Sequence, residues 1–336
     1  MKSGKIPEAV LKRSVIKIVN KQEKQHIVSK AAVGNDAGLF AQEEMTGIMA
    51  TSCAALAGLE AGLASLAVHR ACNSLAASGA VPTAVTVQLV LPESAEEADL
   101  KAYMKEILEA CDEAGVALAS GHTQISSFVT EPVVSVTAMG SAPMVMTLEE
   151  NVYGSDLVMT KSAGFAGAAL LAKYYRENLH ERYTYAFIDK AAERQKEFSV
   201  LPEIEAVKEL GIRHMHDVAE GGVFGAVWEL CERLCAGAEL ELKSIPICQE
   251  TVEISEYFDV NPYQLKGDGA LLFLTHDSQV AIKALKEKGI PAAVIGRITD
   301  GNDRVLINGE ETRFLEPNRV DEYEKARAWE RKAVTN

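Results

Sequence analysis

The sequence predicts a protein of two α+β domains, and three observations lead to this prediction. At about 100–200 residues per domain, 336 residues are enough for two domains. Apolar residues make up 48% of the chain, which is enough to build a substantial core. Strand-like and helix-like segments are mixed in both halves, without the regular βαβ succession of a single doubly wound sheet.

The composition narrows the class of partners. The chain has 34 basic and 48 acidic residues, a formal net charge of −14, without long blocks of one sign. This balance argues against nucleic acid or an anionic membrane as the main partner. Residues Met1–Gln25 lack the apolar run of a signal peptide, so we expect a cytoplasmic protein. Six cysteines are scattered through apolar segments, which indicates reduced thiols without disulfides.

Apolar residues at helical spacing predict three helices in the first half. The first begins at a proline that suits a first helical turn, and the strongly apolar stretch Ala54–Val68, which overlaps the second, is interpreted as buried helix. A capping-box spacing from Ser94 to Glu97 opens the third helix, and Gly115 ends it. The three helices are expected over Pro7–Val19, Leu59–Ser78 and Leu100–Cys111.

Runs of β-branched residues between turn signals predict the strands of the first half. The polar turn Gly34–Gly38 precedes the first strand, and the polar segment Gly121–Gln124 joins two later ones. The strands are expected over Gly47–Ala50, Val81–Leu91, Val116–Ala119 and Pro132–Met139.

An acidic, turn-rich segment, Met146–Asp156, marks the predicted domain boundary. We therefore expect an N-terminal domain over residues 1–148, a C-terminal domain over residues 149–320 and a helical tail over residues 321–336. The expected helices of the second half span Ala168–Tyr175, Thr184–Glu197, Ile204–Leu210 and a segment that ends at Cys235. The expected strands span Leu157–Thr160, Glu239–Leu242, Ala270–Thr275 and Ala292–Ile295.

Two pairs of metal-ligand residue types have both a chemical and a structural interpretation. His214 and His216 would share one side of a strand and, with Asp217, could form part of the metal site of a hydrolase. No ligand beyond these neighbouring residues is visible, and ordinary strand-end histidines are the commoner case. Cys231 and Cys235 lie one helical turn apart, which fits two small core side chains better than a metal site.

Two segments could contact phosphate. Lys161-Ser162 resembles the end of a phosphate-binding loop, but Thr160 stands where a Walker A motif requires glycine, which excludes that motif. The segment Gly164–Gly167 could present backbone N–H groups to an anion, although tight entry into a helix explains its glycines better.

The segment Asp217–Val223 is the most informative motif. Asp217 and Glu220 stand three residues apart beside Gly221-Gly222, so the carboxylates could hold a divalent cation while the backbone approaches a phosphate. An N-capping aspartate followed by a glycine turn accounts for the same residues. The motif alone does not decide between the two interpretations.

At these residues the sequence resembles the superfamily of aminoimidazole ribonucleotide (AIR) synthetase, selenophosphate synthetase, thiamine-monophosphate kinase and the HypE-type hydrogenase maturation factor. It is most similar to the HypE-like proteins that are called AIR-synthase-related. The matching segments, in chain order, are Ile6–Arg13, Val33–Gly38, Leu66–His69, Ser78–Pro82, Gly121–Thr123, Val136–Gly140, Met159–Lys161, His216–Asp217, Glu220–Gly222 and Asn261–Tyr263.

The resemblance implies a PurM-like fold. In this fold the strands of an N-terminal α+β domain form a β-barrel across a dimer, and a C-terminal α+β domain follows. ATP and Mg²⁺ are expected between the domains, held by N-terminal aspartates. In HypE-type enzymes ATP drives the dehydration of a carbamoyl group on a C-terminal cysteine, which makes the thiocyanate that supplies cyanide to the [NiFe] centre.

The resemblance also implies site residues. It assigns the metal to Asp36 and Asp217, and catalytic roles to Asp217, Glu220 and Lys161, with Lys161 paired to a phosphate. The nucleotide or substrate is expected at Asn35, Asp36, Asn73, Gly121, His122, Thr123, Gly221 and Gly222.

The sequence departs from the family pattern at acidic positions. Asn35, Ser52 and Ser74 replace the usual acids, Ala219 replaces the usual threonine of the glycine turn, and no cysteine stands at the end of the chain. Because Mg²⁺ requires hard, charged oxygen ligands, these replacements weaken the expected cation site.

Two functions follow from this pattern. We favour a divergent or inactive family member that keeps the dimer and the cleft and acts as a binding or maturation partner. It would be a homodimer, or a heterodimer with an intact paralogue. The alternative is an active ATP- and Mg²⁺-dependent enzyme that acts on another small substrate by phosphoryl transfer or ATP-driven dehydration. Neither function involves nucleic acid or a membrane.

Overall fold

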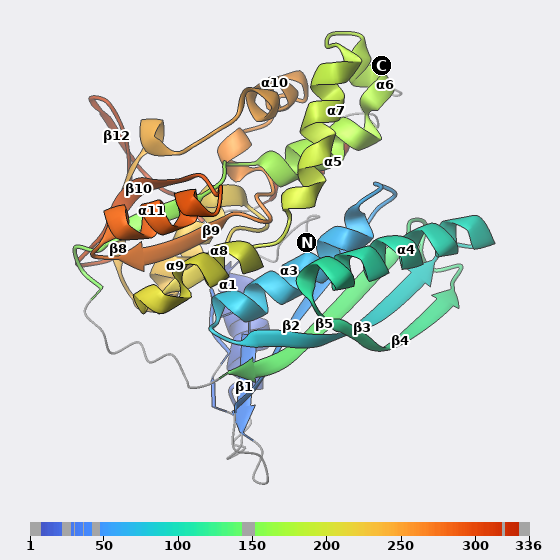
Figure 1. The fold of residues 1–336 in the computed structure, drawn as a ribbon, viewed down its shortest axis with the longest axis horizontal. Coiled ribbons are helices and arrows are strands. Elements are labelled where there is room, and N and C mark those ends of the chain that lie inside the picture. Colours follow the sequence, from blue (N-terminus) through green and yellow to red (C-terminus); the bar gives the residue numbers. More distant parts are fainter. Residues whose placement is uncertain are drawn as a thin grey trace. The chain divides into compact units, whose positions relative to one another are not determined.

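The computed structural model describes residues 8–21, 28–29, 31–35, 37–41, 48–142, 152–317 and 320–328. The chain divides into two compact units. The N-terminal unit consists of residues 23–30 and 36–145, and the C-terminal unit consists of residues 1–22, 31–35 and 146–336. Each unit combines a mixed sheet with helices, which confirms the predicted α+β class (Figure 1).

The N-terminal unit contains a five-stranded sheet of order β1-β2-β5-β3-β4. The strands are β1 (Ala37–Ala41), β2 (Ile48–Ala57), β3 (Val81–Leu91), β4 (Ala117–Ile125) and β5 (Val133–Ala142). Neighbouring strands are antiparallel except β3 and β4, which are parallel. One face of the sheet, with Val87, Leu89 and Val136, is buried beneath α3 (Leu63–Ala77) and α4 (Glu97–Ala114) (Figure 1).

The prediction of a single buried helix over Ala54–Val68 was wrong. Strand β2 continues to Ala57, and α3 begins only at Leu63. From Ser52 onwards, buried and exposed residues alternate along β2, which is the period of a strand. Pairing with β5 along the whole of β2 outweighs the helix preference of its alanines.

The prediction that Gly121–Gln124 forms a link between strands was also wrong. This segment lies inside β4, which pairs with β3 as far as Ile125. Polar residues are tolerated there because β4 is the edge of the sheet and most of its side chains are exposed.

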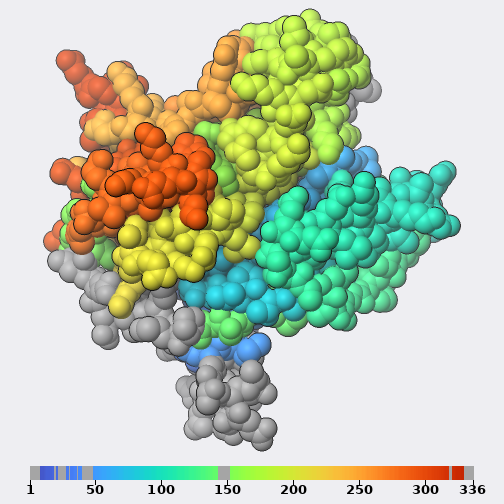
Figure 2. Space-filling view, viewed as in Figure 1, coloured from blue at the N-terminus to red at the C-terminus, as the bar shows by residue number. Residues whose placement is uncertain are grey.

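The predicted third helix is confirmed as α4, and its outer side lies on the surface (Figure 2). Its capping box lies two residues later than expected. The backbone N–H of Glu96 donates to Asp99 Oδ2 at 2.8 Å, and Glu96 in turn accepts from the N–H of Asp99. Gly115 ends the helix in the left-handed region, with φ of 65°.

The C-terminal unit contains a seven-stranded sheet of order β12-β11-β8-β10-β6-β9-β7. The strands are β6 (Asp156–Thr160), β7 (Met215–Asp217), β8 (Gly237–Glu241), β9 (Leu271–Thr275), β10 (Ala292–Thr299), β11 (Arg304–Asn308) and β12 (Glu311–Phe314). Strands β6 and β9 are buried along almost their whole length, which indicates that both of their faces are covered.

Helices pack on the sheet of this unit and extend beyond one end of it (Figure 1). They are α5 (Phe165–Tyr174), α6 (Arg176–His180), α7 (Tyr185–Glu193), α8 (Leu201–Val207), α9 (Gly222–Leu234), α10 (Gln249–Tyr257), α11 (Ser278–Glu287) and α12 (Glu322–Arg327). The sequence pattern did not predict α6, α10, α11, β11 or β12. Strand β12 is fully exposed, so it lacks the alternation of apolar and polar residues that indicates a half-buried strand.

The first predicted helix packs with the C-terminal unit. It is helical over α1 (Glu8–Leu11), a π-helical turn (Lys12–Ile16) and α2 (Lys17–Val19). Trp228 Nε1 donates to Glu8 Oε2 at 2.8 Å, and Lys12 Nζ lies 2.8 Å from Glu232 Oε2. Both partners belong to α9, so the helix is fixed to that element.

Candidate functional site

Two of the predicted catalytic residues, Lys161 and Asp217, lie at the carboxyl ends of strands in the C-terminal sheet. Strands β6 and β7 are both antiparallel to β9, so they run in the same direction and end at the same edge. Lys161 directly follows β6, and Asp217 is the last residue of β7. The Thr160 hydroxyl accepts from the N–H of Leu271 at 2.9 Å, which fixes the end of β6 to the start of β9.

The turn after β7 needs both of its glycines. Gly221 and Gly222 have φ values of 85° and 61°, in the region that favours glycine. A Cβ atom on Gly222 would lie 2.5 Å from Tyr263 O and 2.7 Å from Leu265 O. The pair therefore lets α9 begin in close contact with the backbone of this neighbouring segment.

The N-terminus of α9 is occupied by a carboxylate of the same chain. Asp321 Oδ2 accepts from the N–H of Gly221 at 2.6 Å, and its Oδ1 accepts from the N–H of Tyr323 at 2.7 Å. Asp321 is only 3% exposed, and this burial raises the pKa of its carboxyl, against the opposing effect of the Lys266 ammonium. A negative group at a helix N-terminus is favoured by the helix dipole, so Asp321 holds the position that an external anion would take.

Glu220 and Lys266 belong to the same cluster. Lys266 Nζ donates to Glu220 Oε1 at 3.4 Å and lies 5.0 Å from the centre of the Tyr323 ring. Lys266 is buried, so its ammonium depends on these partners for compensation. Asp217, 4% exposed, ends β7 in register with Leu271.

Lys161 is enclosed by oxygen atoms. Its Nζ donates to the carbonyl oxygens of Glu197, Ser199 and Gly269 at 2.9, 2.8 and 2.7 Å. Glu203 Oε1 lies 2.7 Å from the same atom and supplies the counter-charge. An ammonium has three N–H donors, and all three are used here, which leaves none for a phosphate in this geometry.

Burial shifts both members of this ion pair. Desolvation lowers the pKa of Lys161, although Glu203 opposes the shift, and desolvation raises the pKa of Glu203, although Lys161 opposes that shift. Lys161 also has φ of 56°, which is unusual for a residue with a side chain. The arrangement fastens the β6–α5 loop to the start of α8.

Two family models match the chain. The model for the AIR synthase related protein, N-terminal domain, covers residues 34–142, and the model for the C-terminal domain covers residues 153–308. The chain belongs to the AIR synthase related family. This finding confirms the resemblance and the two-domain PurM-like fold that the sequence motifs predicted.

Curated relatives of this chain are named as a hydrogenase expression/formation protein and as carbamoyl dehydratase HypE. A hydrogenase expression/formation protein of Methanocaldococcus jannaschii is 27% identical over 252 residues, which is 72% of each chain. A carbamoyl dehydratase HypE of Rhizobium leguminosarum is 26% identical over 244 residues, 70% of this chain and 68% of the relative.

Solved structures share the fold. E. coli HypE has a TM-score of 0.71 at 19% identity and covers 94% of this chain and 97% of its own. A structure of a HypE–HypF complex has a TM-score of 0.70 at 17% identity, covering 92% and 100%. A HypE structure in complex with ATP has a TM-score of 0.67 at 16% identity, covering 96% and 98%.

The family's site positions are divided between the two units. Asn35 belongs to the C-terminal unit, and its neighbour Gly34 packs on α9, because a Cβ there would lie 2.3 Å from Glu229 O. Asn73 is buried in α3 of the N-terminal unit. The segment Gly121–Thr123 lies on the exposed strand β4. Asp36 lies outside the described residues.

At one replaced acid position, Ser52, the side chain is buried and unsatisfied. Ser52 is 3% exposed, and its hydroxyl has no hydrogen-bond partner among the residues that the structure describes. A buried hydroxyl without a hydrogen-bond partner lowers the stability of the folded protein. The neighbouring residues therefore do not compensate for the serine at this position.

The described residues alone do not form a metal-binding group. Within the described part of the chain, no group of three or more His, Cys, Asp or Glu side chains is placed to hold a metal ion. The proposed histidine and cysteine ligand pairs are not part of such a group either: His216 Nε2 lies 3.3 Å from Glu229 Oε2, and Cys231 is buried. In the same ranges, no helix is long and apolar enough to cross a lipid bilayer.

Sequence reasoning did not identify Asp321, Lys266 or Glu203 as members of these clusters. Each meets its partner through the fold, and no local motif links them. For Asp321 a signal existed, since an aspartate directly before a helix is a common N-cap, and its side chain accepts from Tyr323 in that way. That pattern does not indicate the second bond to Gly221.

Proposed function

We propose that this AIR synthase related protein is a divergent family member that serves hydrogenase maturation as a binding partner. One observation supports this most strongly. The two groups expected to face a nucleotide phosphate, the Gly221 N–H and the Lys161 ammonium, are both satisfied within the chain. A phosphate would have to displace Asp321 from the first and break a buried ion pair at the second.

The replaced acids support the same proposal. Asn35, Ser52 and Ser74 supply neutral oxygen atoms where the family has carboxylates. Phosphoryl transfer depends on cations that neutralise the developing charge, and neutral ligands hold Mg²⁺ poorly. The chain therefore keeps the family fold while it lacks three of the carboxylates that the family pattern places at this site.

The proposed partner class rests on the relatives. Their names refer to hydrogenase expression or formation, and one solved HypE structure is a complex with HypF. We propose that this chain likewise acts by contact with a maturation protein. An intact HypE-type paralogue is the first candidate.

A dimer would cover the open face of the N-terminal sheet. Thr86 and Thr137 are directly paired on the face opposite α3 and α4, and both are partly exposed. Parallel strands such as β3 and β4 are usually covered on both faces, yet β4 is almost fully exposed. We propose that a second copy or a paralogue covers this face.

In light scattering, Thr137→Lys should shift a dimer to monomer, and an unchanged mass would contradict the proposal.

A second candidate is an active ATP-dependent enzyme. One observation favours it: Asp217, Glu220 and both glycines remain together in a single turn after β7. If Asp321 left the N-terminus of α9, the Gly221 N–H would become available to an anion.

Calorimetric titration with ATP, with and without Mg²⁺, separates the two functions. The partner function predicts no Mg²⁺-dependent binding by the natural sequence at millimolar ATP. The enzyme predicts micromolar Mg²⁺-dependent binding that is lost in Asp36→Ala and Asp217→Ala. A variant with Asn35→Asp, Ser52→Asp and Ser74→Asp is the matched control, since restored acids should increase Mg²⁺-dependent binding.

The partner role has its own measurement. The protein is mixed with a HypE-type paralogue from the same genome, and the mass of the mixture is followed by light scattering. A stable heterodimer is the expected result. Failure to associate with this paralogue, together with tight Mg²⁺-dependent ATP binding, would overturn the partner function in favour of the enzyme.

A further inference from the structure

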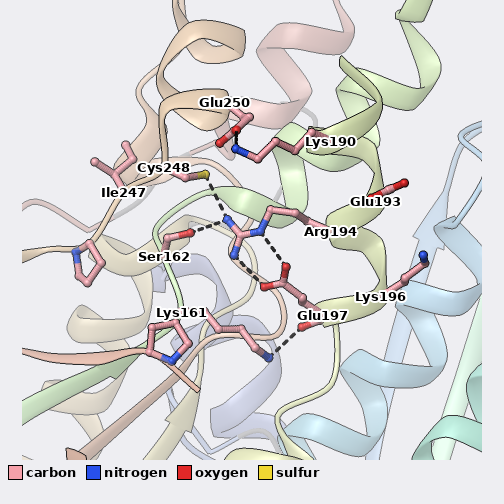
Figure 3. Close-up of a pocket in the computed structure, with 12 residues that line it drawn as sticks. Lys161, Ser162, Lys190, Glu193, Arg194, Lys196, Glu197, Ile247, Cys248 and Glu250 are labelled. Carbon is pink, nitrogen blue, oxygen red and sulfur yellow. Dashed lines mark hydrogen bonds and ion pairs between the residues drawn. The ribbon is translucent and has the colours of Figure 1, made fainter. Parts of the chain in front are cut away.

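A pocket of about 610 Å³ lies in the C-terminal unit (Figure 3). Two of the cations that line it are paired within the chain. Arg194 donates to the carboxylate of Glu197 and to Cys248 Sγ, and Lys190 forms an ion pair with Glu250. An anion from outside would have to displace these partners, so the pocket does not indicate a ligand.

Strand β12, at one edge of the sheet of the same unit, is open on its outer side (Figure 1). All four of its residues are exposed, and no described strand pairs with that side. The strand at the opposite edge, β7, is buried along its whole length. An exposed edge strand presents unpaired backbone groups that can pair with another chain.

The hydrogen-bond pattern shows which backbone groups of β12 point outward. The N–H of Leu315 donates to Arg304 O at 2.7 Å, which continues the antiparallel register of β11 and β12. In such a pair, residues that bond to the neighbouring strand alternate with residues that do not. Glu311 and Arg313 therefore direct their backbone groups to β11, whereas the N–H and C=O of Thr312 point away from the sheet.

The side chains of β12 carry opposite charges on one face. Glu311 and Arg313 are two residues apart, so they share a face, and Thr312 lies between them on the other. Within the described ranges, neither charged side chain forms an ion pair. Charges on an edge strand protect it against pairing with most chains. A strand with the opposite order of charges is the exception, since each charge would meet its counter-charge.

We propose that β12 pairs antiparallel with β12 of a second copy of this chain, with the twofold axis at Thr312. The two Thr312 residues exchange two backbone N–H···O=C hydrogen bonds, because their outward groups face each other. In this register Glu311 of each copy lies directly opposite Arg313 of the other, and two ion pairs form. In-register parallel pairing places like charges opposite each other, so the charges select the antiparallel arrangement.

Phe314 supports the same pairing. Its side chain is 68% exposed and lies on the same face of the strand as Thr312. In the proposed register it is a diagonal neighbour of Thr312 of the second copy, within reach of an aromatic ring. The interface uses the same surface on both copies and therefore closes at two. It is independent of the proposed partner function, because β12 belongs to the C-terminal unit and lies beyond residues 153–308 that the family model matches.

The mass of the whole protein as a function of concentration tests the proposal. Because only four residues pair, we expect weak association that appears at high protein concentration. Sedimentation equilibrium from about 1 to about 300 µM should show the mass rising towards twice its value at the lowest concentration. That lowest value reports the interface proposed for the N-terminal unit, so the two interfaces are measured separately. A mass that does not rise would overturn the pairing of β12.

Charge reversal tests the register. Glu311→Arg and Arg313→Glu should each abolish the rise in mass, because like charges then lie opposite each other. An equimolar mixture of these two variants should associate, since every charge again meets its opposite. Glu287→Arg, an exposed charge reversal on α11, is the matched control and should leave the rise unchanged. Association of the separate variants, or none in the mixture, would contradict the register.

Thr312→Pro tests the backbone bonds. Proline removes the outward N–H and leaves the hydrogen bonds between β11 and β12 in place, as edge strands allow. The rise in mass should disappear while the circular dichroism spectrum stays that of the natural protein. If this variant does not fold, the charge reversals still decide. A folded Thr312→Pro protein that associates like the natural protein would overturn the proposal.

Discussion

The carboxylate of Asp321 accepts a hydrogen bond of 2.6 Å from the backbone N–H of Gly221, 100 residues earlier in the chain. This bond joins the start of α12 to the start of α9, at the glycine turn that the sequence motif predicts to contact a ligand. The position with the greatest attraction for an anion in this turn is therefore filled by the protein itself.

Asp321→Ala should destabilise the protein by about 1–3 kcal/mol, because the buried Gly221 N–H loses its acceptor. Urea unfolding measures the change. Glu316→Ala, an exposed carboxylate close by in the sequence, is the control and should change little. Equal stability of Asp321→Ala and the natural protein would show that the bond contributes nothing.

The same contact should depend on pH. Burial raises the pKa of Asp321 above its ordinary value of 3.8, so the folded protein holds this proton more readily than the unfolded chain does. The stability that Asp321 contributes is therefore fullest below that ordinary value, and it is lost as the pH rises through the folded-state pKa. Urea unfolding of the natural protein and Asp321→Ala, from below pH 3.8 to neutral pH, should give a shrinking difference. A constant difference would contradict the raised pKa.

Lys161→Met should cost about 3–5 kcal/mol, because it leaves the carboxylate of Glu203 buried without its counter-charge. Adding Glu203→Leu to this variant should recover part of the loss, which a double-mutant cycle from urea unfolding measures. Lys208→Met is the matched control, since it breaks an exposed ion pair with Glu205 and should change little. Simple additivity of the Lys161 and Glu203 changes would argue against the coupling.

Gly222→Ala should be markedly more destabilising than Gly211→Ala. Both glycines have positive φ, 61° and 68°, so each substitution introduces backbone strain of about 1–2 kcal/mol. A Cβ at Gly211 meets nothing within 4 Å, whereas one at Gly222 overlaps the backbone of Tyr263 and Leu265. Thermal unfolding of the two variants separates the effect of strain from that of overlap. Equal losses of stability would mean that the backbone of Gly222 is not in tight contact with Tyr263 and Leu265.

The sequence by itself determined the fold class, the family and most of the elements with strong periodicity. Helix α4 and strand β5 show why: their apolar residues repeat at the period of the element, and this pattern is local. The boundary between β2 and α3 was misjudged because its alanines suit either element, and pairing with β5 decides between them.

Only the tertiary structure decided the chemistry of the site. Lys161 meets Gly269 across 108 positions of sequence, and Arg194 meets Cys248 across 54. A charge that enters the interior needs a compensating group, and the fold determines which group is near enough to supply it. No local pattern of residues contains that information, so a lysine expected to bind phosphate is enclosed instead by carbonyls and a carboxylate of its own chain.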